Sequence, residues 1–250
     1  MDNKELEQTL VLIKPDALKN SLTGYVLSML SEFHSGLRFA AAKIVHVSRM
    51  LAEEHYAEHL GKPFYPPLLD YIMGLDHYPD EPHKRRVIAL VYQGPDAVQK
   101  MREMVGPTNP LVAREKKPGC IRSLGTLVPV HDAAGNVISQ RMDNLIHASA
   151  TPPEAEREIK LWFKPNDIPP LMQIYPTEVC DSLYYFNQGK LATDYAPGGV
   201  CLLAPGDIAW ASDLDALRLL RAGQPAPCTL GTVAAKYLIN EQRGDLQGIA

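Results

Sequence analysis

The chain has 250 residues, of which 46% are hydrophobic and 22% are charged, and its formal net charge is −4. This composition is typical of a packed globular protein, and the negative balance argues against specific nucleic-acid binding, which needs basic patches. No segment approaches the ~20 uninterrupted apolar residues of a membrane span. The polar, acidic start at residues 1–8 predicts no secretory signal or transit peptide, and the four widely spaced cysteines favour reduced thiols in a cytoplasmic protein.

Strands and helices are predicted to alternate along the chain. The strands are expected at 9–13, 38–47, 87–92 and 126–130, and the helices at 23–33, 50–59, 65–73, 95–105 and 153–163. This order is typical of an α+β sandwich in which helices pack on a small antiparallel sheet.

One histidine, His147, closes an apolar segment directly before a predicted helix. An unprotonated imidazole is a usable nucleophile near neutral pH and can accept a phosphoryl group. Thr151, with prolines after it and Glu154 three residues on, predicts the helix start through a capping box. Glu158 borders the apolar face of this helix, from which its carboxylate can be partly buried and can orient the imidazole.

Each of these residues also has an ordinary interpretation. A lone histidine is more often structural than catalytic, and a glutamate on a helix is more often solvated. In the same way, Arg102 can be a solvated helix residue, Arg122 a surface charge and Phe64 a core side chain.

Four motifs follow one another along about the first three quarters of the chain. Lys14-Pro15-Asp16 follows the first strand, and residues 55–68 read H-Y, then K-P-F-Y and L. Residues 102–122 carry R, G-P-T-N-P and P-G-C-I-R, and residues 144–163 carry N-L-I-H-A-S and a helix ending in L-W-F. Together they resemble the nucleoside diphosphate kinases, and the agreement of separate motifs is far more specific than any one of them.

The resemblance implies a ferredoxin-like βαββαβ sandwich, with a four-stranded antiparallel sheet and a small helical C-terminal extension. It also implies that a nucleoside triphosphate phosphorylates His147, which passes the phosphoryl group to a nucleoside diphosphate. The residues implied in catalysis are His147, Glu158 as the group that orients it, Lys14, and Ser149 as the support of Glu158. Those implied in substrate binding are Lys14 and Asn144 at the ribose, Arg102, Thr108 and Arg122 at the phosphates, Phe64 and Leu68 at the base, and Tyr56 near the phosphates and His147.

Mg²⁺ is expected to arrive on the nucleotide phosphates, so no protein metal ligands are predicted. No P-loop pattern is present, which excludes a Walker-type kinase. The sequence departs from the family pattern at Ala17, Lys62, Pro107 and Ala150, and none of these changes removes a group implied to touch the transferred phosphate.

The kinase-like domain is predicted to span 1–186, with two insertions at about 75–86 and 129–141. The first insertion is polar and reads as a surface loop, and the second reads as a hairpin that either borders the nucleotide cleft or extends into solvent. Residues 187–250 form a C-terminal extension with helices expected at 212–222 and 229–241. Two short helices are too little for an independent core, so the extension should pack on its own core or on a neighbouring subunit.

The predicted function is that of an active nucleoside diphosphate kinase in a cytoplasmic homo-oligomer, either a hexamer, a tetramer or a dimer. The alternatives are a non-catalytic nucleotide-binding module that keeps the fold and a phosphohistidine relay to a protein partner. Retention of His147, Glu158, Lys14, Arg102 and Arg122 favours the enzyme over the binding module.

Overall fold

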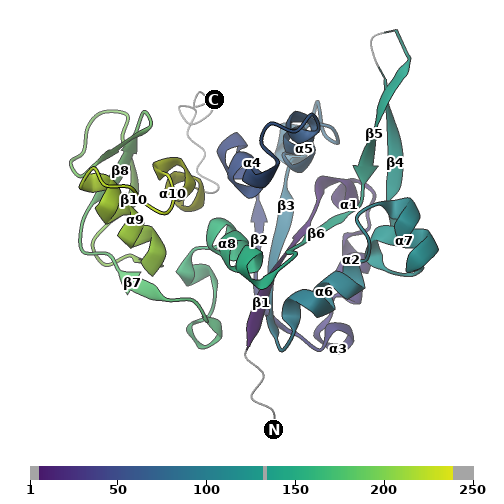
Figure 1. The fold of residues 1–250 in the computed structure, drawn as a ribbon, viewed down its shortest axis with the longest axis horizontal. Coiled ribbons are helices and arrows are strands. Elements are labelled where there is room, and N and C mark those ends of the chain that lie inside the picture. The colour runs from purple at the N-terminus through teal and green to yellow at the C-terminus, as the bar shows by residue number, and fades with distance from the viewer. Residues whose placement is uncertain (1–5, 132–133, 239–250) are drawn as a thin grey trace. The chain divides into compact units, whose positions relative to one another are not determined.

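The first apolar segment of the chain forms β1 (Glu7–Ile13), a central strand of the main sheet in this computed structural model. The structure describes residues 6–131 and 134–238. These residues fold into two compact units, one comprising residues 1–44 and 74–155 and the other residues 45–73 and 156–250 (Figure 1).

The sheet of the first unit has the strand order β2-β3-β1-β6, with β2 at Arg38–Val45, β3 at Val87–Gly94 and β6 at Ile146–Ala148. Strand β1 runs antiparallel to both β3 and β6, and Val11 faces Leu90 on one side and Ala148 on the other. Helices α2 (Thr23–Met29) and α6 (Ala97–Val105) make the two crossovers. This arrangement confirms the predicted ferredoxin-like βαββαβ sandwich.

The helices of the first unit pack on the sheet through one apolar cluster. Val26 of α2 and Met101 of α6 are fully buried in it, together with Val11 and Ile13 of β1. The helix predicted over 23–33 ends at Met29 because Ser31 starts a separate short helix, α3 (Glu32–Ser35), with its hydroxyl accepting from the His34 N–H. Two further helices are α1 (Pro15–Lys19) and α7 (Pro110–Lys116).

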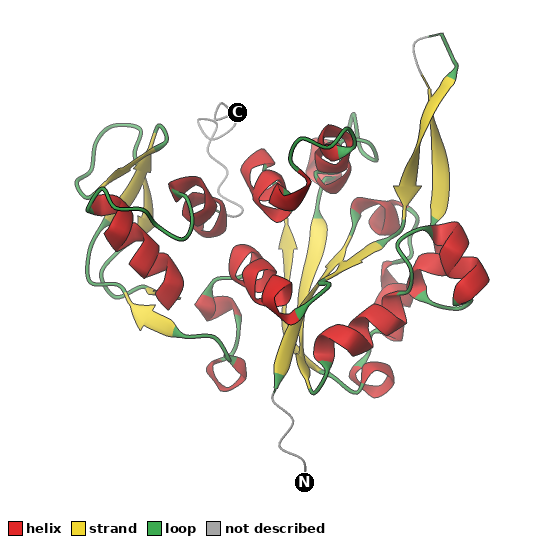
Figure 2. Cartoon of the chain, viewed as in Figure 1, coloured by secondary structure: helices red, strands yellow, loops and turns green. Residues whose placement is uncertain are grey.

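Both predicted insertions belong to the first unit. The second is the expected hairpin, in which β4 (Thr126–His131) pairs antiparallel with β5 (Val137–Asp143) (Figure 2). Residues 132–133 lie outside the described part. The first insertion forms turns and a short 3₁₀ helix (Pro82–Lys84) before β3.

The second unit joins α4 (Arg49–His55) and α5 (Tyr65–Ile72) to the C-terminal part of the chain. Helix α8 (Pro152–Trp162) begins in the first unit and ends in the second. The C-terminal elements are β7 (Thr177–Val179), β8 (Tyr184–Asn187), β9 (Lys190–Ala192), β10 (Val200–Leu203), β11 (Ile208–Trp210), α9 (Ala211–Arg221) and α10 (Leu230–Tyr237).

The extension is therefore more than the two predicted helices. It also contains β9 and β10, which pair with β8, and β11, which pairs with β7; β7 and nearly all of β8 precede residue 187. Helix α10 matches the helix expected at 229–241 as far as Tyr237, and residues 239–241 lie outside the described part. Its buried side chains, Val233 and Tyr237 among them, share an apolar cluster with Leu217 of α9, against which Met50 of α4 packs. The extension thus buries its apolar face within its own chain.

A buried polar group completes this second core. Asp213 accepts from Lys236 Nζ at 2.6 Å and from the Tyr237 hydroxyl at 3.2 Å. The indole N–H of Trp210 donates to the carbonyl of Phe163, at the end of α8, at 2.9 Å. Because buried polar groups are costly unless paired, these bonds fix how α9 and α10 pack. Among the described residues, no helix is long and apolar enough to cross a membrane.

Candidate active site

His147 lies in the middle of β6, directly opposite Leu12 of β1, and is partly exposed. Two residues earlier, Leu145 is buried with φ at 70°, a conformation that costs a non-glycine residue about 1–3 kcal/mol. Two bonds hold it: its N–H donates to Asp16 Oδ2 at 2.8 Å, and its carbonyl accepts from the Lys14 N–H at 2.9 Å. The start of β6 is therefore fixed by the turn that follows β1.

Lys14 and Asn144 are both buried and touch each other, with the ammonium donating to the amide oxygen of Asn144. The amide nitrogen of Asn144 donates to the carbonyl of Thr108 at 2.9 Å. Three predicted site residues, from the end of β1, the loop before α7 and the start of β6, are thus brought together within the first unit.

Burial lowers the pKa of Lys14 to about 8. The carboxylate of Asp16 opposes this effect, the guanidinium of Arg122 adds to it, and Asp143 opposes it again. An ammonium with such a pKa is charged at neutral pH and loses its charge within a mildly alkaline range.

Arg122 is buried, which excludes the surface-charge interpretation. Its Nη2 and Nε donate to the carbonyl of Ile146, the neighbour of His147, at 3.0 and 3.3 Å. Its Nη1 donates to the carbonyl of Gly106 at 3.0 Å and to the Thr108 hydroxyl at 3.5 Å. The guanidinium therefore ties the loop that carries Thr108 to the strand that carries His147.

Ser149 lies at the end of β6, where its hydroxyl is hydrogen-bonded to the backbone of Leu10. The capping box after it is confirmed in part: Thr151 accepts from the Glu154 N–H at 3.3 Å, while the Glu154 carboxylate accepts from the Ala150 N–H at 3.1 Å. The Glu154 carboxylate thus accepts from the N–H of the residue before the N-cap, and not from the N–H of Thr151 as in a full capping box. These bonds set the start of α8.

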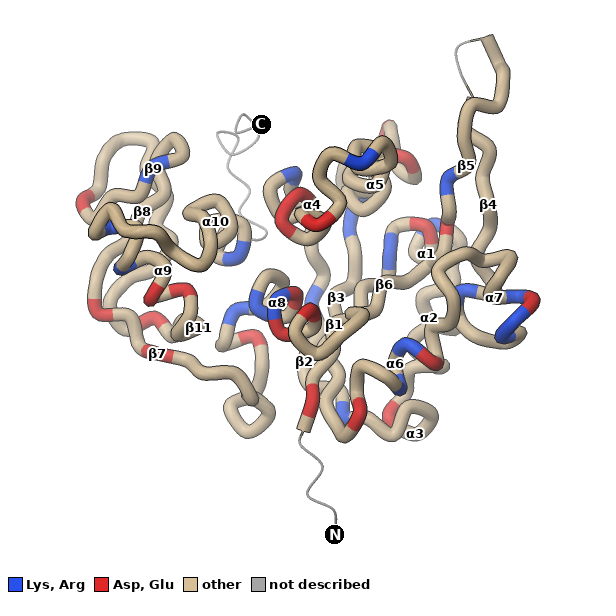
Figure 3. Tube along the Cα trace, in the orientation of Figure 1, with Lys and Arg blue, Asp and Glu red and all other residues tan. Residues whose placement is uncertain are grey.

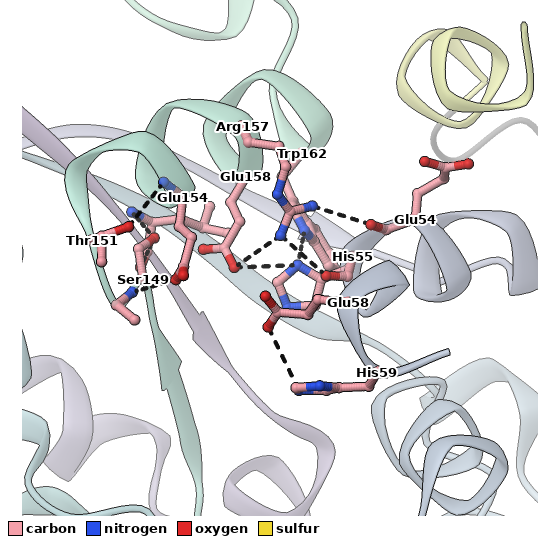
Figure 4. A network of polar contacts seen from close by, with 12 residues as sticks. Glu54, His55, Glu58, His59, Ser149, Thr151, Glu154, Arg157, Glu158 and Trp162 are labelled. Carbon is pink, nitrogen blue, oxygen red and sulfur yellow. Dashed lines mark hydrogen bonds and ion pairs between the residues drawn. The ribbon is translucent and has the colours of Figure 1, made fainter. Parts of the chain in front are cut away.

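In the second unit, Glu158 is buried in α8, which excludes the solvated interpretation. One carboxylate oxygen lies 3.9 Å from His55 Nδ1 and 3.8 Å from Arg157 Nη2 (Figure 4). The indole N–H of Trp162 donates to the same His55 Nδ1 at 3.2 Å. A nitrogen that accepts this bond carries no proton, so His55 is the neutral tautomer protonated on Nε2.

Tyr56, Phe64 and Leu68, three of the predicted substrate contacts, are here called the clamp. Tyr56 and Phe64 lie in the segment between α4 and α5, and Leu68 lies in α5. Phe64 has 51% of its surface exposed, which excludes the core interpretation, and Leu68 lies one helical turn further on. Tyr56 is buried, and its ring stacks on His59 with centroids 6.0 Å apart. The exposed ring of Phe64 offers a flat apolar surface to a ligand.

Arg102 is exposed on α6 and lines a surface cavity of about 630 Å³ with Gly106, Pro107, Lys117 and Thr151. In the described part of the chain, no hydrogen bond engages its guanidinium. It is therefore the predicted phosphate ligand that the structure leaves solvated.

Sequence reasoning missed Asp16, Asp143 and His77 as residues that hold the site. The K-P-D motif contained Asp16, but its bond to Leu145 spans 129 residues and leaves no local signal. His77 donates from Nε2 to Asp143 Oδ2 at 3.0 Å, a contact between the first predicted insertion and the last residue of β5.

An α+β sandwich that carries a partly exposed histidine, with buried lysine and arginine side chains in the same unit, fits a phosphotransferase. A family model described as nucleoside diphosphate kinase matches residues 7–168. The nucleoside diphosphate kinase of Thermococcus kodakarensis is 37% identical over 204 residues, covering 81% of this chain and 99% of the relative. The chain belongs to the nucleoside diphosphate kinase family.

Solved structures agree with this assignment. A crystal structure of the Aquifex aeolicus nucleoside diphosphate kinase matches with a TM-score of 0.53 and 28% identity, over 66% of this chain and 100% of that one. The Halobacterium salinarum enzyme in complex with CDP matches with a TM-score of 0.51 and 30% identity, over 68% of this chain and 95% of that one.

Proposed function

We propose that this nucleoside diphosphate kinase transfers the γ-phosphate of a nucleoside triphosphate to a nucleoside diphosphate through a phosphohistidine on His147. The observation that carries the proposal is the position of His147 on a strand fixed by the strained, doubly hydrogen-bonded Leu145. A nucleophile held in this way loses little freedom when the phosphorus atom approaches. The imidazole attacks the γ-phosphorus of the nucleoside triphosphate, and the nucleoside diphosphate leaves. A second nucleoside diphosphate then attacks the phosphorus of the phosphohistidine, which releases the free imidazole.

The phosphates bind in this proposal beside Lys14, Arg122 and Thr108, which meet next to Asn144. Arginine and lysine stabilise the charge that spreads over the phosphoryl oxygens. Arg102, solvated in the structure, is the guanidinium available to reach a triphosphate tail. Mg²⁺ enters with the nucleotide and neutralises phosphate charge.

The base binds in this proposal against the exposed ring of Phe64, with Leu68 and Tyr56 as further substrate-binding residues of the same unit. A stacking surface accepts any base because every base has a π-face. The CDP in the Halobacterium salinarum relative supports a diphosphate as substrate. No observation favours a non-catalytic module or a relay to a protein.

The proposal includes a homo-oligomer. Strand β2 lies at an edge of the sheet, and Ile44 on it is 60% exposed. Exposed apolar edge strands are template surfaces for pairing with another chain.

The proposal places the protein in the cytoplasm. Four free thiols, on Cys120, Cys180, Cys201 and Cys228, support this location.

The reaction scheme is tested by two-substrate kinetics. Initial rates with ATP and GDP, plotted in double-reciprocal form at several fixed GDP concentrations, should give parallel lines, because the two nucleotides react in separate half-reactions. Lines that intersect would indicate direct transfer in a ternary complex and would contradict the phosphohistidine.

Glu158→Gln should leave nucleotide binding nearly unchanged and slow phosphorylation of His147 on the order of 10²-fold, since in this proposal the carboxylate orients the imidazole of His147 and does not bind the nucleotide. Rapid-quench phosphorylation and equilibrium ADP binding measure the two effects separately. Glu156→Gln is the matched control, because Glu156 lies on the same helix and pairs with Lys160. A loss of ADP affinity with an unchanged phosphorylation rate would contradict the role of Glu158.

Phe64→Ala should raise the KM of ATP, GTP and CTP by similar factors, about five- to 150-fold, because stacking contributes about 1–3 kcal/mol whatever the base. Steady-state kinetics with the three nucleotides measures this. Phe33→Ala removes another exposed phenylalanine, on α3, and should leave all three KM values as they are. A change confined to one base would show that Phe64 reads base identity.

A further inference from the structure

The first insertion and the β4–β5 hairpin meet in a group of four charged or titratable residues, here called the clasp: Asp76, His77, Arg141 and Asp143. His77 is 3% exposed and donates from Nε2 to Asp143 Oδ2 at 3.0 Å. Arg141 donates from Nε to Asp143 Oδ1 at 2.7 Å and from Nη2 to Oδ2 at 3.3 Å. Arg141 Nη1 also lies 3.4 Å from Asp76 Oδ2, so the arginine joins the first insertion to the hairpin.

The clasp keeps a negative charge buried at Asp143. Burial alone would raise the pKa of this carboxyl, but hydrogen bonds from His77 and Arg141 outweigh burial and lower the pKa below its ordinary value. A buried carboxylate that accepts three charge-assisted or imidazole bonds stays ionised at neutral pH. Figure 3 shows acidic and basic positions close together around α1 and the end of β5.

This charge lies next to the proposed phosphate site. Asp143 immediately precedes Asn144, whose side chain accepts from the Lys14 ammonium. The charged groups that act on Lys14 are Asp16 on α1, Arg122 after α7 and Asp143 at the end of β5, and the two carboxylates favour its charged form. On the other side, Lys19 of α1 donates from Nζ to the carbonyl of His77 at 2.8 Å. The clasp is thus tied to the chain both before and after the site.

We propose that the clasp is a positioning device for phosphoryl transfer, in which the first insertion and the β4–β5 hairpin fix Asn144 and hold the Lys14 ammonium in its charged form at the nucleotide phosphates. This inference rests on the proposed function of Lys14. The same contacts could serve only to anchor the hairpin, and the two roles differ in how activity responds to pH. An anchor affects stability at every pH, whereas a charge that acts on Lys14 affects activity where Lys14 titrates.

The test is the pH dependence of kcat/KM for ATP in the full chain, which reports groups of the free enzyme. Lys14 is charged below its pKa of about 8 and neutral above it, so kcat/KM should fall as the pH rises through 8. Asp143→Asn removes a negative charge that favours the ammonium. The fall should therefore move to lower pH, with about a twofold loss of kcat/KM at pH 8 and little loss at pH 6.5.

Lys14→Arg makes the assignment specific, because arginine stays charged throughout this range. In Lys14→Arg, the fall of kcat/KM above pH 8 should disappear. The double variant Lys14→Arg/Asp143→Asn should show the same pH profile as Lys14→Arg alone. Glu81→Gln is the matched control: Glu81 is an acidic residue of the same insertion, paired with Lys84, and its loss should leave the profile unchanged. The proposal would be overturned if Asp143→Asn lowered kcat/KM equally at all pH values. It would also be overturned if Asp143→Asn still shifted the pH profile in a chain that carries Lys14→Arg.

If Asp143→Asn does not fold, Arg141→Lys tests the same proposal. Arg141 is partly exposed, so its substitution disturbs the fold less than that of the buried Asp143. Lysine keeps the charge and loses the two-pronged contact, so the KM for ATP should rise severalfold at unchanged kcat. A lowered melting temperature with unchanged KM would show an anchor only. A wild-type enzyme without any ATP–GDP exchange would instead disprove the proposed function, so the two failures are distinguishable.

Discussion

His147→Ala should lower the rate of ATP–GDP exchange on the order of 10⁵-fold or more, because removing a covalent nucleophile leaves only binding and charge stabilisation. Nucleotide binding should persist, since Lys14, Arg122 and Phe64 remain. The coupled exchange assay measures the first effect and equilibrium binding of ADP the second.

His34→Ala is the control for this experiment. His34 is an exposed histidine on α3 that contacts Ser31 and the Ser28 carbonyl, so its loss should leave exchange unchanged. Residual exchange in His147→Ala above a few per cent of the wild-type rate would show that the phosphoryl group does not pass through this imidazole.

Deleting everything after Phe186 should destabilise the second unit severely. Phe186 lies within β8, so the cut removes both strands paired with β8 and both helices that close the apolar cluster. Met50 of α4 loses the partners that cover it, and newly exposed apolar surface favours association. We expect a lower melting temperature, a higher KM for nucleotides through the clamp helices and larger particles in light scattering coupled to size exclusion.

Two leucine-to-alanine substitutions, one at a buried and one at an exposed position, test the packing of the second unit without deleting any of the chain. Leu217→Ala, at a side chain with 0% exposure in α9, should destabilise the protein by about 2–5 kcal/mol. Leu171→Ala, at a fully exposed side chain of the same unit, should change stability by less than about 0.5 kcal/mol. A truncated chain with unchanged melting temperature, KM and assembly size would show that the extension is a loose appendage.

Local patterns predicted the elements that have strong local causes. The apolar segments of β1 and β3, the capping box of α8 and the alternating hairpin after Thr126 all depend on neighbours in sequence, and the structure has them. The strands β6 to β11 were missed because they have only three or four residues each, too few for a period to be recognised.

The division into two compact units has no local signal either. Residues 45–73, which contain the clamp, pack with the C-terminal part of the chain, and the pairing of α4 with α10 joins residues about 180 positions apart. The clasp was missed for the same reason, since His77 and Asp143 are 66 residues apart and each looks like an ordinary loop or strand residue. Motif order, in contrast, predicted His147, Lys14, Asn144 and Arg122 as site residues, because each lies in a distinctive short sequence.

The central claim is a covalent phosphohistidine on His147, and one experiment tests it most directly. The purified enzyme is incubated with γ-labelled ATP and Mg²⁺, separated from nucleotide, and then chased with GDP. We expect label on the protein that is acid-labile and base-stable, that maps to the peptide containing His147, and that GDP removes as labelled GTP. Label that survives in His147→Ala, or label on His147 that GDP does not remove, would contradict the account.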